Sequence, residues 1–135
     1  MQAAILNVKL TYLESWTEGR IKMATWYNYF LQDLDDLILP KIAGDSNHVF
    51  HLYVIRSKKR DALQHYLLFH GIGTAIHYPV PPHLQTAFLN LQFEKVDFSL
   101  IEEIDDTCLS LPLWPGMMEE EVSRVCKSIN GFFQN

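Results

Sequence analysis

The chain has 135 residues, which suits a single domain large enough to bury a real hydrophobic core. Its formal net charge is −5 and it carries no basic stripe, so nucleic acid is not expected among its partners. No apolar run approaches the roughly 20 residues of a membrane span, and the N-terminus lacks the pattern of a signal peptide, so we expect neither a membrane segment nor export.

The first predicted element is a long helix over residues 1–34, because this segment has no proline and only one glycine. Its apolar residues form two neighbouring stripes at helical spacing, whereas a helix that packs on one core needs only one. The first stripe comprises Leu6, Leu10, Leu13, Ala24, Tyr27 and Leu31, and the second comprises Ile5, Val8, Tyr12, Trp16, Met23 and Phe30. The pattern also begins at Met1 without an N-cap residue. Two interpretations stay open: a helix cut in its middle, or a helix that dimerises through its second face.

A loop over residues 37–49 leads into a predicted strand over residues 49–57, which is apolar on both alternations. Ser57 is placed to cap a helix over residues 58–70, and Gly71 is placed to end it. The core side of this helix is predicted to consist of Leu63, Tyr66 and Leu67.

Two further strands and a final helix complete the pattern. Residues 73–79 and 109–115 predict short strands, and residues 119–133 predict a helix with acidic residues in its first turn. The inward face of that helix is predicted to consist of Val122, Val125, Ile129 and Phe132. Helices that alternate with such short strands predict an α+β fold in which helices cover a small sheet. The pattern alone leaves the direction of the strands open.

Residues 96–108 predict one more helix. Ser99 and Glu102 have the spacing of a capping box, in which each side chain bonds to the other's backbone N–H. The apolar face is predicted to consist of Ile101, Ile104 and Cys108. Cys108 and Cys126 both lie in apolar helical patterns and are expected to be buried free thiols, which indicates a reducing compartment, the cytoplasm.

The residues that could carry chemistry are few. Six histidines suggest a metal site, but there is no HExxH or CxxC motif, and His48 and His51 would point to opposite faces of a strand. We therefore expect no metal. No nucleophile motif is present. Adjacent carboxylates are plentiful, but they lie at predicted helix ends or on solvated faces, so we expect no acid–base pair among them.

The stretch GIGTAIHYPVPPHLQTA, residues 71–87, is the most distinctive in the sequence. Three prolines within four residues fix the backbone just after a predicted strand, and His77, Tyr78 and His83 flank them. Rigid loops at strand ends commonly hold ligand groups. The same side chains could instead be packing residues in a turn, and the loop alone does not decide between these interpretations.

Four ordered stretches carry a family resemblance: QAAILNVKLTYLESW, HVFHLYVIRSKKRDALQHYL, HGIGTAIHYPVPPHLQTAF and CLSLPLWPGMMEEEVSRVCKSI. They resemble the C-terminal region of sugar aminotransferases of the DegT/DnrJ/EryC1/StrS type. The resemblance implies the small domain of a fold-type I pyridoxal-phosphate enzyme, with a mainly antiparallel sheet flanked by helices. It also implies transfer of an amino group, usually from glutamate, to a nucleotide-linked keto-sugar in polysaccharide or deoxysugar biosynthesis.

The resemblance makes residues 1–135 one small domain, with residues 1–34 as an interdomain helix and the N-terminal cofactor domain expected to be missing. None of the lysines resembles the surroundings of the family's aldimine lysine: Lys9, Lys22, Lys41, Lys58, Lys59, Lys95 and Lys127. Pyridoxal phosphate is therefore expected in the full-length family but not on this chain alone, which is expected to be inactive. Met117 and Met118 stand where relatives usually have a capping Ser or Thr.

The resemblance also implies that His77 and Tyr78, and less directly His83, contact the sugar nucleotide. A homodimer is expected as well. Two alternatives remain beside the enzyme fragment: a free-standing module that binds a sugar nucleotide, and a dimerisation unit.

Overall fold

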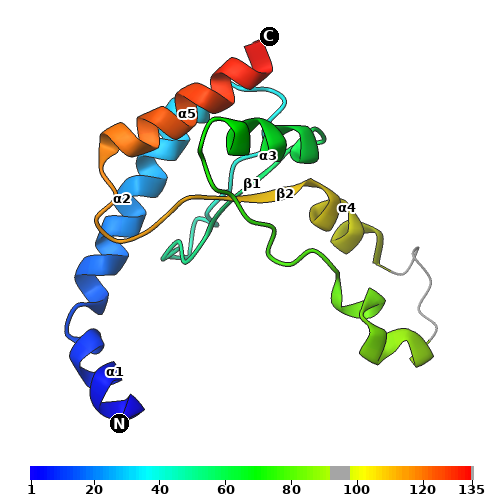
Figure 1. Cartoon of the computed structure of the whole chain (residues 1–135). Coiled ribbons are helices and arrows are strands. Elements are labelled where there is room, and N and C mark those ends of the chain that lie inside the picture. Colours follow the sequence, from blue (N-terminus) through cyan, green and yellow to red (C-terminus); the bar gives the residue numbers. More distant parts are fainter. Residues whose placement is uncertain (92–97, 135) are drawn as a thin grey trace.

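The structure is a computed structural model that describes residues 1–91 and 98–134, and it has a central body with two projecting arms (Figure 1). The body contains β1 (Tyr53–Arg56), β2 (Cys108–Leu111), α3 (Arg60–Phe69), α5 (Glu119–Gln134) and the second half of α2 (Leu13–Leu31). One arm contains α1 (Gln2–Leu10) and the start of α2. The other contains the short 3₁₀ helices η1 (Pro82–Leu84) and η2 (Thr86–Leu91) and helix α4 (Ser99–Thr107). The predicted α+β fold is confirmed.

The predicted single helix over residues 1–34 is wrong, because it is interrupted between α1 and α2. The Thr11 hydroxyl donates a 2.7 Å hydrogen bond to the carbonyl of Val8. The backbone N–H of Tyr12 bonds instead to the carbonyl of Lys9, at 3.0 Å. A threonine side chain that competes for a helix carbonyl favours such a break.

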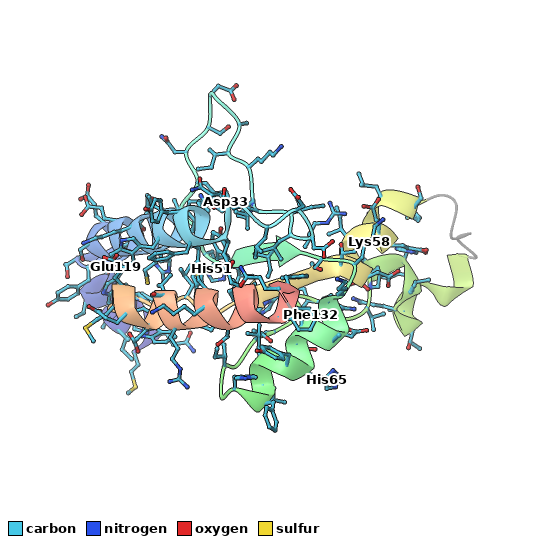
Figure 2. The ribbon with its side chains drawn as sticks, turned by 90° about the horizontal axis from the view of Figure 1, so that it is seen from above. Asp33, His51, Lys58, His65, Glu119 and Phe132 are labelled. Atoms are coloured by element: carbon cyan, nitrogen blue, oxygen red, sulfur yellow. The ribbon has the colours of Figure 1, made fainter. Side chains whose placement is uncertain are left out.

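The two halves of this segment differ completely in burial. Residues 1–15 are all exposed, whereas Met23, Ala24, Tyr27 and Leu31 are buried in the second half of α2. The second half of α2 lies side by side with α5 in both views (Figures 1 and 2). The predicted inward face of α5 is confirmed, since Val122, Val125 and Ile129 are buried and Phe132 packs against the core.

Helix α5 starts without a Ser or Thr cap, as the sequence indicated, but its first turn compensates. The Glu121 carboxylate accepts a 2.8 Å hydrogen bond from the backbone N–H of Met118, which is half of a capping box. Three glutamates in the first turn also lie at the positive end of the helix dipole. The Met117–Met118 departure therefore does not leave this helix end unsupported.

Strands β1 and β2 are antiparallel, with Tyr53 opposite Leu111 and Arg56 opposite Cys108. Isolated bridges extend the sheet on both sides: Ile38 pairs with Arg56, and Ala75 pairs with Ser110. The predicted strand over residues 73–79 is therefore wrong as a strand, because only Ala75 finds a partner beside the four-residue β2. All four residues of β2 are buried.

The strand predicted over residues 49–57 is shorter than expected. Phe50 has a φ of +47°, a left-handed conformation that breaks an extended chain. Its backbone N–H donates a 2.9 Å hydrogen bond to Nδ1 of His48, and its ring is buried. Regular pairing begins only at Tyr53, so His48 and His51 lie in a loop rather than on a strand.

Helix α3 matches its prediction in part. Leu63 and Leu67 are fully buried as predicted, whereas Tyr66 is half-buried. The predicted Ser57 cap is wrong, because the helix begins at Arg60 with Lys59 as its N-cap and no side-chain cap bond. The Ser57 hydroxyl instead accepts a 3.1 Å hydrogen bond from the N–H of Lys59, before the helix starts. Gly71 ends the helix with a φ of +71°, and the N–H of Ile72 then bonds back to the carbonyl of Leu67.

Two predictions for α4 are wrong. Ser99 makes no side-chain cap, because it is the first residue of the helix and Phe98 is at the N-cap position. The Glu102 carboxylate bonds to His83 instead of closing a capping box. Cys108 is not on the helix but opens β2, and Ile101 and Ile104 are exposed. The apolar face of this amphipathic helix is therefore left uncovered by the described part of the chain.

Two stacked tyrosines lie at the centre of the body. The rings of Tyr27 and Tyr53 have centroids 4.7 Å apart. The Tyr27 hydroxyl donates to the carbonyl of Pro112 at 2.8 Å, and the Tyr53 hydroxyl donates to Oδ1 of Asn28 at 2.6 Å. This pair joins α2, β1 and the segment after β2. None of the described helices has the length and apolar character needed to cross a membrane.

The two leucines at the end of α3 give a matched stability test. Leu67 is fully buried and Leu68 is 67% exposed. We predict that Leu67→Ala lowers the free energy of unfolding by about 3 kcal/mol because it leaves a core cavity, and that Leu68→Ala changes it by less than about 0.5 kcal/mol. Urea denaturation followed by circular dichroism measures both, and equal effects would contradict the packing described.

Stability should also fall at alkaline pH. Burial raises the pKa of the Cys126 thiol to about 12 from its ordinary 9.0, and it raises the pKa of the Tyr27 and Tyr53 phenols as well. Above pH 9 the unfolded chain releases protons that the folded chain keeps, so stability that is complete below pH 9 is lost as the pH rises.

The Cys126→Ala variant isolates the thiol. Between pH 8 and pH 10 it is expected to lose about 1.4 kcal/mol less stability than the wild type, because one proton fewer is linked to unfolding. Urea denaturation at each pH measures this difference, and parallel losses in the two proteins would refute it.

Candidate functional site

His77 and Tyr78 leave the edge of the sheet together and line one small pocket. Nδ1 of His77 is 2.8 Å from the hydroxyl of Ser110 in β2, whereas Tyr78 is 75% exposed. The pocket has a volume of about 250 Å³ and includes Asp105 from α4. Its apolar walls are formed by Val80, Pro81, Pro82, Ile101, Ile104 and Cys108.

The backbone of the loop is stiff for two reasons. Pro79, Pro81 and Pro82 each fix one backbone torsion. The chain then turns into η1, where the N–H of Leu84 bonds to the carbonyl of Pro81 at 3.0 Å and the N–H of Gln85 to that of Pro82 at 3.2 Å. Tyr78 thus projects from a segment with little conformational freedom.

The third predicted residue, His83, lies apart from this pocket. It is buried, and its Nε2 is 3.1 Å from a carboxylate oxygen of Glu102. Its ring also lies against Phe98, with centroids 4.7 Å apart. The structure therefore brings His77 and Tyr78 together and holds His83 against α4.

Sequence reasoning did not single out Ser110, Glu102 or Asp105 as site residues. Glu102 was assigned to a cap, and Asp105 resembled any solvated acid on a helix. Ser110 carried a weak signal, since it is the one polar residue of a strand that is otherwise apolar or cysteine. Only the folded chain shows that these three lie beside the proline loop.

The pocket can bind hydroxyl groups but is poorly suited to covalent catalysis. Imidazole, phenol and carboxylate groups supply hydrogen-bond donors and acceptors. Burial raises the pKa of the Cys108 thiol, so this cysteine stays protonated and is a weak nucleophile. The site therefore fits recognition of a polyhydroxylated ligand better than bond-making.

A larger cavity lies elsewhere, between the loop that follows α2, the segment that joins β1 to α3, and α4. It measures about 890 Å³ and carries both signs of charge. Arg56 pairs with Glu103 at 2.6 Å, and Lys59 pairs with Asp36 at 3.0 Å. Within residues 1–91 and 98–134, no three metal-binding side chains come close enough to hold an ion.

The lysines do not fit a pyridoxal-phosphate site. An aldimine lysine must reach the cofactor inside a pocket that also holds its phosphate. Lys58 and Lys59 line the cavity of about 890 Å³, where Lys59 is paired with Asp36. All the lysines in the described ranges are exposed, and none of them lines the pocket beside His77. These are Lys9, Lys22, Lys41, Lys58, Lys59 and Lys127, whereas Lys95 lies outside the described residues.

Two known proteins of similar sequence are both sugar aminotransferases by name. The chain is 41% identical over 132 residues to a dTDP-3-amino-3,6-dideoxy-alpha-D-galactopyranose transaminase of Aneurinibacillus thermoaerophilus, covering 98% of this chain and 36% of that protein. It is 36% identical to a UDP-N-acetyl-3-dehydro-alpha-D-glucosamine 3-aminotransferase of Acidithiobacillus ferrooxidans, covering 96% and 34%. The chain thus spans about a third of the length of these relatives.

The fold matches as well as the sequence. Superposition on DesV of S. venezuelae, solved with a ketimine intermediate, gives a TM-score of 0.95 at 33% identity, over 99% of this chain and 36% of that one. Other solved proteins of this fold hold the cofactor as PLP or PMP. The match to the family model covers residues 1–130 and corresponds to the C-terminal region of the full-length proteins. The chain belongs to the DegT/DnrJ/EryC1/StrS aminotransferase family.

Proposed function

We propose that this chain is the sugar-recognising part of a nucleotide-sugar aminotransferase, whose cofactor chemistry resides outside these 135 residues. The observation that carries the proposal is the match of nearly the whole chain to about a third of the length of such enzymes. The reaction would move an amino group, from glutamate, onto a keto-sugar linked to dTDP or UDP. Two buried free cysteines agree with work in the cytoplasm.

Within this proposal His77 and Tyr78 contact the sugar nucleotide. Both line the pocket of about 250 Å³, and the Tyr78 side chain extends into solvent, where a ligand can reach it. The neighbouring Asp105 carboxylate accepts hydrogen bonds from hydroxyl groups. His83 acts differently, through the support that it gives to the loop.

The arm formed by α1 and the start of α2 exposes many apolar side chains, which supports the proposal that a partner covers this surface. Ile5, Leu6, Val8, Leu10, Tyr12 and Leu13 are each at least half exposed. A contiguous apolar surface of this kind is seldom left to solvent. We propose that a cofactor-bearing domain covers it in the working enzyme and that a second copy of this chain covers it otherwise.

A second candidate, a free-standing module that binds sugar nucleotides, shares the pocket but needs no cofactor domain. The well-formed core around Tyr27 and Tyr53 favours a body that folds by itself. Both candidates predict binding without amino transfer by this chain. They differ in whether the apolar arm recruits a cofactor domain.

The chain alone should not form an aldimine. We predict that mixing it with pyridoxal phosphate and borohydride leaves no covalent adduct on Lys9, Lys22, Lys41, Lys58, Lys59, Lys95 or Lys127 beyond that on a urea-unfolded sample, because the lysines in the described ranges are exposed to solvent and none of them is held in the pocket beside His77. Intact-mass spectrometry and peptide mapping measure the adduct. Selective, stoichiometric labelling of one lysine in the folded chain would refute the proposal.

Sugar-nucleotide binding should depend on the Tyr78 hydroxyl. We predict that Tyr78→Phe weakens binding of UDP- or dTDP-sugars about fivefold, since one exposed hydrogen bond is worth about 1 kcal/mol. The matched control is Tyr29→Phe, which removes an equally exposed phenol from α2. Isothermal titration calorimetry measures both, and equal affinities in the two variants would place the site elsewhere.

The exposed arm should drive self-association. We predict that the wild-type chain shows concentration-dependent dimers in sedimentation and that Leu6→Glu with Leu10→Glu abolishes them, because charges do not bury in an apolar contact. Leu68→Glu, at a similarly exposed leucine on α3, is the control and should leave association unchanged. A wild-type chain that stays monomeric at high concentration would contradict this prediction.

A further inference from the structure

We propose that Ser110 and Glu102 are positioning residues that hold the proline loop by its two histidines. Ser110 fixes His77 at the start of the loop, and Glu102 fixes His83 at its end. This inference rests on the proposed function, since it assigns the loop to sugar-nucleotide recognition. It adds two residues that do not face the ligand.

The first attachment is made by Ser110, which is buried and held in the sheet. Ser110 is 5% exposed, and its backbone exchanges two hydrogen bonds with Ala75, at 2.8 and 3.2 Å. Across the other edge it lies opposite Val54 of β1. Its hydroxyl, 2.8 Å from Nδ1 of His77, therefore lies at a fixed point and fixes the imidazole. The His77 side chain held in this way lines the pocket.

The second attachment, between His83 and Glu102, is largely shielded from solvent. The side chains of His83 and Glu102 are 5% and 20% exposed, and Nε2 of His83 lies 3.1 Å from the Glu102 carboxylate. The ring of Phe98 lies against the imidazole with an interplanar angle of 32°. A hydrogen bond to a carboxylate in such a place is stronger than the same bond in water.

Both attachments come from one continuous segment, because β2 follows α4 directly. That segment is fastened to β1 where the two elements meet: the Arg56 side chain donates a 3.0 Å bond to the Thr107 hydroxyl and also pairs with Glu103. The loop, α4 and β1 thus form one rigid unit.

Prolines alone would not give the same result. Three fixed torsions make the loop stiff, but a stiff loop held at one end can still swing as a body. Between His77 and His83 only five residues remain, and three of them are proline. Attachment at both ends prevents this rigid-body motion of the loop. The backbone therefore positions Tyr78, and its hydroxyl does not have to bond to the protein. Binding then costs little ordering of the loop.

The test compares deletion and conservative variants of the full chain. Glu102→Ala and Ser110→Ala each remove one attachment, whereas Glu102→Gln and Ser110→Thr keep a hydrogen-bonding group. Glu120→Ala and Ser128→Ala on α5 are the matched controls. Three properties are measured for each protein: amide hydrogen exchange at Leu84 and Gln85, the ring-nitrogen shifts of His77 and His83 by NMR, and affinity for UDP- and dTDP-sugars.

Release of the loop should appear in all three measurements. Glu102→Ala should speed exchange at Leu84 and Gln85 about tenfold and shift His83 alone, and Ser110→Ala should shift His77 alone. Each should weaken sugar-nucleotide binding about five- to tenfold, with recovery in the conservative variants. Exchange in α3 and α5 should stay unchanged, which a general loss of stability would not allow.

The two hypotheses fail in different ways. Unchanged exchange and unchanged histidine shifts in both alanine variants would overturn the positioning role, whatever the affinity. A wild-type chain that binds no sugar nucleotide would overturn the proposed function, and with it the assignment of the loop to recognition. Faster exchange with unaltered affinity would show that the attachments do not position the ligand-binding residues, and would also overturn the inference.

Discussion

The structure depends on the complete burial of β2. Leu109 and Leu111 contribute to the core on which α2, α3 and α5 pack, and Ser110 lies between them with its backbone paired on both edges. A strand held in this way is a fixed reference for whatever bonds to it. The imidazole of His77 bonds to it directly, so the core and the candidate site share one rigid element. The same strand continues α4, which holds the other end of the proline loop through Glu102.

The body and the two arms of the molecule differ in how well their apolar side chains are buried. The body buries two stacked tyrosines and the inner faces of three helices. The arms project from the body (Figure 1). Within the described ranges their apolar residues are exposed, among them Leu6 and Leu10 of α1 and Ile101 and Ile104 of α4. The buried core lies in the body, whereas the exposed apolar residues of the arms support the proposal that a partner covers them. A chain that matches about a third of its relatives' length fits this division.

Much of the fold could be predicted from the sequence, because periodic burial leaves a clear pattern. The inward faces of α3 and α5 and the glycine end of α3 followed from spacing alone. The errors arose where side chains compete with regular backbone bonding. Thr11 interrupts the first helix, Phe50 shortens β1, and Glu102 bonds to a distant histidine instead of capping its own helix. The spacing of apolar residues does not encode these side-chain hydrogen bonds, whether they are local, as at Thr11, or distant in sequence, as between Glu102 and His83. For the same reason the loop residues His77 and Tyr78 could be proposed from the sequence, but their supporting residues could not.

The central claim is that this chain recognises a sugar nucleotide at the proline loop and leaves the bond-making to another domain. A chemical-shift map of the ¹⁵N-labelled chain, titrated with UDP- and dTDP-linked sugars, tests the location most directly. We predict that the shifts concentrate on His77, Tyr78 and the Asp105 end of α4. Shifts confined to the cleft beside Arg56 and Lys59, or no shifts at saturating ligand, would contradict the account.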